Sequence, residues 1–224
     1  MSSPDSLPTL STLERALQAT LPMARLERCT VPQCEGLTLA LINADFPTGP
    51  LPPGVSEAVI AQPAYWAFCW GSGQALARYL LANPEVVRDK RVLDLGSGSG
   101  VAGIAAARVG AAEVVACDTD ANARAASALN AELNGVALRV SDDLAQCGRF
   151  DRVLMADVLY DAANLPLLEA ACNHGEQIWV ADSRIRSLND PAYQLVTQIE
   201  ALTLPNLGEF DEFSHTRIWC RRGI

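Results

Sequence analysis

The chain has 224 residues, with 17 basic and 26 acidic side chains, so its formal net charge is −9 at pH 7, and half of its residues are hydrophobic. This length accommodates one α/β domain with a sizeable core, or such a domain with a short extension. The excess of negative charge argues against a nucleic-acid partner, because binding a phosphate backbone requires a basic face.

The sequence predicts a cytoplasmic protein that does not enter the membrane. The first ten residues include Asp5 and no basic run ahead of an apolar stretch, so we do not expect a signal peptide. The longest apolar-rich window, 101–117, is interrupted by Arg108 and Glu113, whereas a membrane helix needs about 20 nearly uncharged residues. Seven cysteines without a C-x-x-C pair, and only two histidines, indicate reduced thiols and no metal site.

The first third of the chain predicts a few loosely connected elements. Ser11-Thr-Leu-Glu14 has the spacing of a capping box, in which Ser11 caps a helix over 12–20 and Glu14 bonds back to it. The apolar run 37–42 predicts a strand. The Pro/Gly-rich segment 47–54 predicts a loop.

From Trp70 onward, strand and helix patterns alternate. Strands are predicted over 91–95, 113–117, 137–140, 152–156 and 177–181, and helices over 74–81, 101–109, 121–133, 164–172 and 191–200. Two last strands, near 203–210 and 215–221, have no helix between them and are expected to form an antiparallel hairpin. The pattern predicts a doubly wound α/β fold with a mostly parallel seven-stranded sheet.

The most informative stretch is Val92-Leu-Asp-Leu-Gly-Ser-Gly-Ser-Gly100, at the junction of the first of these strands with a helix. Glycines there permit a tight turn and the close approach of a ligand, and the helix N-terminus offers unpaired amides. The dinucleotide fingerprint G-x-G-x-x-G/A is not met, because the sixth position from Gly96 is Val101. The loop residues expected to contact a cofactor are Gly96, Ser97, Gly98 and Gly100.

Acidic residues follow the next two strands. Asp118 ends the second strand, where a carboxylate can accept hydrogen bonds from both ribose hydroxyls of a nucleoside; the alternative is a surface residue that caps the next helix. Asp143 follows the third strand and is expected to face an adenine amino group, or else to lie in a solvated turn. Thr119 and Ala156, at the ends of the second and fourth strands, complete the expected cofactor contacts.

These features together resemble the seven-strand S-adenosylmethionine-dependent methyltransferases, over about residues 65–221. Asp157-Val-Leu-Tyr160 is similar to the D-x-x-Y sequence of lysine methyltransferases of this fold. The segment from Pro63 to Leu80, PAYWAFCWGSGQALARYL, resembles a stretch of the methyltransferases that act on lysines of the electron transfer flavoprotein β subunit. Bacterial relatives of that group are often labelled nicotinamide N-methyltransferases. Ser183 stands where many relatives carry proline in D-P-x-R.

The resemblance implies a Rossmann-like methyltransferase domain over 63–224, with S-adenosylmethionine as cofactor, behind an N-terminal extension over 1–62. Asp157 is then expected to orient the acceptor amine, with Tyr160 beside it; the alternatives are a helix cap and a packing aromatic. Trp70 is expected to line the cofactor pocket. Tyr65 and Trp66 are expected to wall the substrate channel and to offer aromatic faces to an ammonium group, unless they are only core.

Methyl transfer to an amine requires a neutral nucleophile, and lysine in water has a pKa of about 10.4. A partly apolar channel favours the neutral amine through desolvation, and close positioning lowers the barrier. We therefore expect a protein-lysine N-methyltransferase whose partner is a protein substrate, possibly the flavoprotein β subunit. The alternatives are a small-molecule N-methyltransferase such as a nicotinamide-type enzyme, a nicotinamide-cofactor oxidoreductase, which Val101 and the hairpin disfavour, and a non-catalytic binding module.

Overall fold

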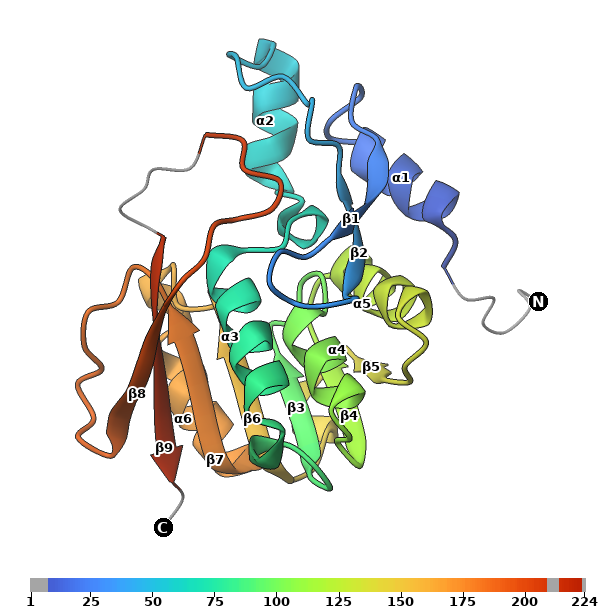
Figure 1. Ribbon diagram of the computed structural model, residues 1–224. Helices are drawn as coiled ribbons and strands as arrows, with labels where there is room; N and C mark the ends of the chain where they lie inside the picture. Colours follow the sequence, from blue (N-terminus) through green and yellow to red (C-terminus); the bar gives the residue numbers. More distant parts are fainter. Residues whose placement is uncertain (1–7, 209–213, 223–224) are drawn as a thin grey trace.

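The structure, a computed structural model, describes residues 8–208 and 214–222 (Figure 1). Its main sheet has seven strands in the order β5-β4-β3-β6-β7-β9-β8. The five parallel strands are β3 (Arg91–Leu95), β4 (Glu113–Cys117), β5 (Arg139–Ser141), β6 (Phe150–Ala156) and β7 (Gly175–Asp182). The antiparallel hairpin consists of β8 (Tyr193–Glu200) and β9 (His215–Arg222), with β9 next to β7. The predicted fold class is confirmed.

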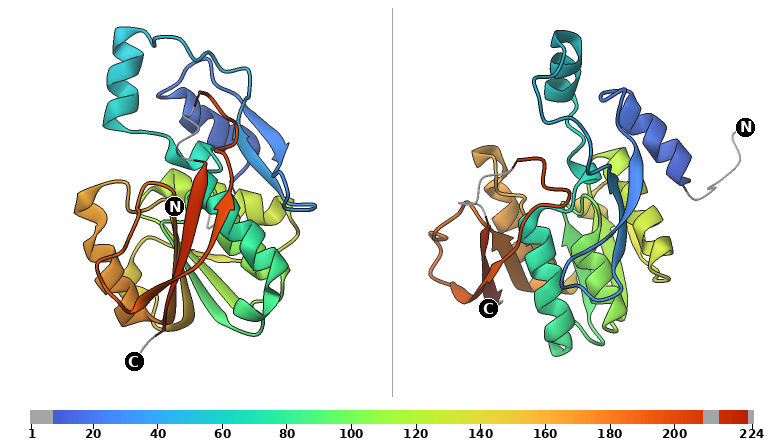
Figure 2. Two further views of the ribbon diagram at one scale, coloured as in Figure 1. Left: turned by 60° about the vertical axis from the view of Figure 1, so that its left-hand side comes forward. Right: turned by 45° about the horizontal axis from the view of Figure 1, so that its top comes forward.

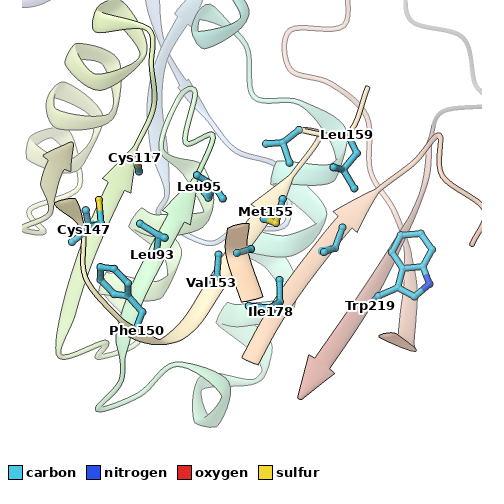
Figure 3. Packing of buried hydrophobic residues seen from close by; sticks show 14 of the residues in the cluster. Leu93, Leu95, Cys117, Cys147, Phe150, Val153, Met155, Leu159, Ile178 and Trp219 are labelled. Atoms are coloured by element: carbon cyan, nitrogen blue, oxygen red, sulfur yellow. The ribbon is translucent and has the colours of Figure 1, made fainter. Parts of the chain in front are cut away.

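Helices cover both faces of this sheet because its central strands are apolar on both sides. In β3, Val92 packs toward α3 (Gly71–Ala82) and α4 (Val101–Arg108), whereas its neighbour Leu93 packs toward α6 (Pro166–His174). Figure 3 shows the second of these clusters, in which Leu93 lies among Val153, Met155 and Ile178. The helix α5 (Ala121–Leu133) lies on the same side as α4 (Figure 1). Short 3-10 helices lie between these elements, at Pro84–Val86, Leu144–Gln146 and Ala162–Asn164.

The N-terminal part of the chain packs on α5. It contains α1 (Leu10–Gln18), a separate hairpin of β1 (Leu26–Thr30) and β2 (Thr38–Ile42), α2 (Pro53–Ala61) and a 3-10 turn, η1 (Tyr65–Ala67). Asn130 in α5 and Asn134, the residue that caps the end of α5, accept hydrogen bonds from β2: Asn130 from the Ala40 amide at 2.7 Å and Asn134 from the Thr38 amide at 3.0 Å. These bonds satisfy backbone groups that the short hairpin leaves unpaired.

The start of the first helix differs from the prediction. The N-cap is Thr9, whose hydroxyl accepts from the Thr12 amide, and the helix begins at Leu10 rather than after Ser11. The carboxylate of Glu14 accepts a hydrogen bond from the Leu26 amide at 2.7 Å, so it ties α1 to β1 and does not close a capping box. A long-range partner therefore replaces the local one that the spacing indicated.

Three further elements differ. Residues 53 and 54 begin helix α2 rather than lying in a loop, and β1 was not predicted. The predicted helix over 191–200 is strand β8, so the hairpin uses this segment and not 203–210. Residues 201–208 form no strand apart from a single bridge between Cys69 and Leu204, and 209–210 lie outside the described residues.

Within the described ranges, no helix is both long and apolar enough to span a membrane. The seven cysteines are free thiols. No group of three or more metal-ligating side chains gathers in the part of the chain that the structure describes.

Candidate active site

The glycine loop between β3 and α4 depends on glycine at two positions. Gly96 has a φ of 73°, and a Cβ there would lie 2.3 Å from a methyl carbon of Val158. Gly100 has a φ of 81°, and its Cβ would lie 3.0 Å from the Cα of Ser127. A Cβ on Gly98, between them, would meet no atom within 4 Å. The loop backbone at Gly98 is therefore open to a ligand.

Polar side chains of α5 support this loop from beneath. The Ser127 hydroxyl donates to the Ser97 hydroxyl at 3.1 Å and lies 3.2 Å from the Gly98 carbonyl oxygen. The Asn130 amide donates to the Ser99 carbonyl at 2.9 Å. Sequence reasoning missed this support, because serine and asparagine in a helix give no local signal of what they contact.

Asp118 projects from the end of β4 beside the loop. One carboxylate oxygen accepts the Gly98 amide and the other accepts the Asp120 amide, each at 3.0 Å. Burial raises the pKa of Asp118 above its usual value, and these two amides oppose the rise. The carboxylate is thus held in one orientation by backbone donors, as a hydroxyl acceptor should be.

Asp94, inside β3, is buried and accepts the Gly103 amide of α4 at 2.9 Å. Burial raises the pKa of this carboxyl to about 7. Because a Cβ on Gly103 would lie 2.9 Å from this carboxylate, glycine there lets α4 approach the strand. Asp94 fixes the helix that follows the glycine loop.

Asp157 follows β6 directly, with a φ of 53°, a left-handed conformation that is uncommon outside glycine. Its side chain is 8% exposed. The carboxylate accepts the Ser72 amide at 2.9 Å and the Ser72 hydroxyl at 2.7 Å, and Arg184 lies 3.5 Å away. Burial raises the pKa of Asp157 to about 6, against the effect of these donors.

Aromatic rings from two segments meet across the site. The Tyr65 ring makes edge-to-face contacts with Trp70, at 5.8 Å between centroids, and with Tyr160, at 5.4 Å. The Trp70 indole N–H donates to the Tyr65 carbonyl at 2.8 Å. Tyr65 and Tyr160 are 45% and 52% exposed, whereas Trp66 is buried. Two segments far apart in the sequence therefore form one aromatic wall.

Part of the glycine loop, Asp118, Asp157 and the aromatic rings line one cavity of about 580 Å³ at the carboxyl ends of the parallel strands, a size typical of a ligand site. Among the predicted residues, its lining includes Tyr65, Trp66, Trp70, Gly96, Gly98, Asp118, Thr119, Ala156, Asp157 and Tyr160. Lining residues that were not predicted include Asp120, Ala123, Asp142, Leu144, Val158, Asn164, Leu167 and Arg184.

Three predicted residues lie behind or beside this lining. Ser97 and Gly100 are buried in the loop, where they shape it. The carboxylate of Asp143 accepts the Ala145 amide and the Gln146 side-chain amide, each at 2.9 Å, whereas the adjacent Asp142 lines the cavity. The Asp-Asp pair in the sequence does not indicate which carboxylate turns inward.

The amino-acid sequence is similar to that of known methyltransferases. Residues 72–174 match the family model described as ribosomal protein L11 methyltransferase. The mouse protein named electron transfer flavoprotein beta subunit lysine methyltransferase is 37% identical over 169 residues, which cover 69% of this chain and 66% of that protein. The zebrafish (Danio rerio) protein of the same name is 43% identical over 127 residues, covering 53% and 49%.

Solved structures show the same fold at low sequence identity. A 16S rRNA methyltransferase of T. thermophilus, in complex with S-adenosylmethionine and guanosine, has a TM-score of 0.55 and is 18% identical over 90% of this chain and 51% of that chain. Magnesium protoporphyrin IX methyltransferase from Synechocystis has a TM-score of 0.51 and is 15% identical, covering 79% and 90%.

The fold, the glycine loop and these similarities define a Rossmann-like methyltransferase, and the chain belongs to the S-adenosylmethionine-dependent methyltransferases. Within that class it is similar to the electron transfer flavoprotein β-subunit lysine methyltransferases, and it spans about two thirds or less of the length of those relatives. Its cofactor is S-adenosylmethionine. The site fits this cofactor, because the open backbone at Gly98 and the oriented carboxylate of Asp118 face one cavity.

Proposed function

We propose that this enzyme methylates the side-chain amine of a lysine in a protein, and that the protein is the electron transfer flavoprotein β subunit. One observation carries the proposal: a single cavity joins the glycine loop and Asp118 to Asp157 and the tyrosine pair, Tyr65 and Tyr160. A cofactor and an acceptor amine can therefore meet in it. The similarity to β-subunit lysine methyltransferases supports the acceptor.

In this proposal the cofactor lies over the glycine loop. The loop of Gly96, Ser97, Gly98 and Gly100 holds its amino-acid part, and Asp118 accepts from the ribose hydroxyls. Trp70, Thr119 and Ala156 form neighbouring walls of the same cavity. Near the adenine we assign an acidic contact to the Asp142-Asp143 pair, in which Asp142 lines the cavity.

The acceptor amine occupies the other half. When bound, S-adenosylmethionine would supply an electrophilic methyl group, whose bond to the sulfonium sulfur breaks as the bond to nitrogen forms and leaves a neutral thioether. Tyr65, Trp66 and Tyr160 provide a partly apolar channel that favours the neutral lysine amine, and their ring faces stabilise the charge that appears on nitrogen as the new bond forms. Asp157 orients the amine from the end of β6 and stabilises the same developing charge. The proton of the amine leaves to solvent through the exposed side of the tyrosine pair.

A protein acceptor is favoured over a small amine by the shape of the cavity mouth. A small-molecule enzyme would be expected to enclose its substrate with residues 40–64, but the described lining begins at Tyr65. Tyr65 and Tyr160 are about half exposed, so a side chain can reach them from the surface of another protein. A nicotinamide-type acceptor gains no support from this geometry.

Two further assignments belong to the proposal. We assign residues 1–62 to an N-terminal extension and 63–224 to the methyltransferase domain; the hydrogen bonds from β2 to Asn130 and Asn134 support a contact between the described part of the extension and the domain. We also assign the protein to the cytoplasm, which is supported by its seven free cysteines.

Purified enzyme, S-adenosylmethionine and purified flavoprotein β subunit test the function, with the intact mass of the subunit followed over time. We expect a mass increase of whole methyl groups, located to lysine by peptide mapping. Parallel reactions contain nicotinamide in place of the subunit, and reactions without enzyme and with an Asp157→Ala enzyme serve as controls. Methylated nicotinamide together with an unchanged subunit would reject the proposal in favour of the small-molecule alternative.

A further inference from the structure

The helix α2 is unusual for a helix on a protein surface. Its nine residues, PGVSEAVIA, contain one charged side chain, Glu57, and none of the nine is buried. Ile60 is 80% exposed, more than any other large apolar side chain among the described residues. Surface helices usually turn charged or polar residues to solvent, whereas the exposed side of α2 presents Ile60 beside Glu57, so Ile60 is a candidate for contact with another molecule.

The position of α2 connects it with the candidate active site. In Figures 1 and 2 the helix projects beyond the carboxyl ends of the parallel strands, which is the end where the cavity lies. The inner side of α2 is fixed, because Val55 and Val59 are half-buried against the cluster that contains Leu13 and Trp66. The helix is therefore held on the body while Ile60 faces away from that cluster.

The chain runs directly from α2 to the wall of the cavity. Tyr65 follows Ile60 by five residues, so their Cα atoms are at most about 18 Å apart. Tyr160 contacts Tyr65, and Leu165, between the lining residues Asn164 and Leu167, is 49% exposed. Exposed apolar side chains thus occur both on α2 and around the mouth.

The charge of the cavity indicates the chemistry of the occupant. Asp118 and Asp142 are assigned to the cofactor, and Asp120 lies beside Asp118, so the carboxylate in the acceptor half is Asp157, which pairs with Arg184. The amine of a partner's lysine is complementary to Asp157, and the exposed Glu57 and Ile60 of α2 are complementary to a surface that carries a basic and an apolar side chain. A lysine with an apolar neighbour on the same protein surface satisfies both.

We propose that α2 is the docking element for the protein substrate: an apolar side chain near the target lysine packs on Ile60 while the lysine enters the cavity beside the contacting rings of Tyr65 and Tyr160. This inference rests on the proposed function and adds the surface that recognises the acceptor. Recognition of the folded partner then occurs outside the cavity. A short lysine peptide has the amine but not the folded surface that contacts α2.

The test compares Ile60→Ser with Leu195→Ser, a matched control, because Leu195 is 56% exposed on β8 at the far edge of the sheet. Initial rates are measured with the intact flavoprotein β subunit and with a short peptide that contains the unmodified target lysine of that subunit. For Ile60→Ser we expect KM for the subunit to rise about tenfold, equivalent to about 1.4 kcal/mol, with kcat and the peptide KM unchanged. Leu195→Ser should behave as the unaltered enzyme.

Three outcomes would overturn the inference. The first is an unchanged KM for the subunit in Ile60→Ser. The second is an equal rise in KM for the subunit and for the peptide in Ile60→Ser. The third is the same rise in KM for the subunit in Leu195→Ser. Sedimentation of the unaltered enzyme and of Ile60→Ser identifies a competing occupant, because a dimer lost only in Ile60→Ser, with KM unchanged, would show that a second copy covers α2. Failure of the unaltered enzyme to methylate the subunit rejects the proposed acceptor, and the docking role with it.

Discussion

Ser72 binds the carboxylate of Asp157 with two hydrogen bonds, one from its amide at 2.9 Å and one from its hydroxyl at 2.7 Å. Ser72 lies in the first turn of α3, where backbone amides have no partner within the helix and favour a negative charge. Asp157 therefore fixes the start of α3 while its carboxylate lines the cavity. The hydrogen bonds between Ser72 and Asp157 therefore couple the start of α3 to the position of the carboxylate that we propose orients the amine.

The two roles of Asp157 separate in variants. Asp157→Ala should lower kcat for methyl transfer by at least about 100-fold with little change in cofactor affinity, and it should also lower the melting temperature, because the amide of Ser72 loses its acceptor. Ser72→Ala keeps the hydrogen bond from its backbone amide to the Asp157 carboxylate, so this variant should retain most activity. Calorimetry of cofactor binding and initial rates provide the measurements. Equal losses of activity in the two variants would limit Asp157 to anchoring α3.

The activity should depend on pH through Asp157. Burial raises the pKa of this carboxyl to about 6 from its ordinary value of 3.8, so the ionised form is lost as the pH falls through about 6. If the ionised form orients the amine, kcat should decline on the acid side of pH 6. In Asp157→Asn this acid limb should vanish at a lower overall rate, whereas the limb due to the acceptor amine remains. An identical acid limb in both enzymes would assign it to another group.

Asp118 should act on the cofactor and not on the methyl-transfer step. Because its carboxylate is held by the Gly98 and Asp120 amides and lines the cavity, Asp118→Ala should weaken S-adenosylmethionine binding about 10- to 100-fold. At saturating cofactor, kcat should stay within a few-fold of the unaltered enzyme. Calorimetric titration measures the binding. Unchanged affinity would show that Asp118 only organises the loop.

Two variants of Tyr160 distinguish the contribution of its aromatic ring to activity from that of its hydroxyl. Tyr160→Phe keeps the edge-to-face contact with Tyr65 and should leave kcat/KM nearly unchanged, whereas Tyr160→Ala should lower it about tenfold. The comparison uses the same protein substrate for both variants. A loss in Tyr160→Phe as large as that in Tyr160→Ala would assign the effect to the hydroxyl.

The buried carboxyl of Asp94 should make stability depend on pH. Its pKa of about 7 lies above the ordinary 3.8, so the folded state binds a proton more tightly than the unfolded state, and this stabilisation is lost as the pH rises through about 7. Asp94→Asn keeps an acceptor for the Gly103 amide but does not titrate. Denaturant unfolding should show that the free energy of unfolding of the variant, relative to that of the unaltered protein, rises by about 2 kcal/mol from pH 5 to pH 8. A constant difference would contradict this.

Most of the parallel half of the fold followed from the sequence because β3, β4, β6 and β7 each contain a short apolar run with glycine or aspartate at or directly after its end. Strand β8 did not, since it lies at the sheet edge with Leu195 and Val196 both exposed. The register shift between Leu195 and Thr197 also disturbs the alternation that identifies a strand. Edge strands with a bulge have little of the pattern on which sequence analysis relies.

The site was predictable where its chemistry is local and not where it depends on distant partners. The glycine loop is a contiguous signal and Asp118 follows the next predicted strand, and Gly96, Gly98 and Asp118 all line the cavity. Ser72 is 85 residues from Asp157 in the sequence, so nothing local indicates that they are bonded. The choice of Asp142 over Asp143 for the lining likewise depends on how the turn after β5 folds.

The central claim is that the acceptor is a protein. Incubation of the enzyme with methyl-labelled S-adenosylmethionine and a cell extract, followed by separation of macromolecules from small molecules, tests it most directly. The account predicts label in a protein band at the mass of the flavoprotein β subunit, which is nearly absent at early times with the Asp157→Ala enzyme. Label found only in the small-molecule fraction would contradict it.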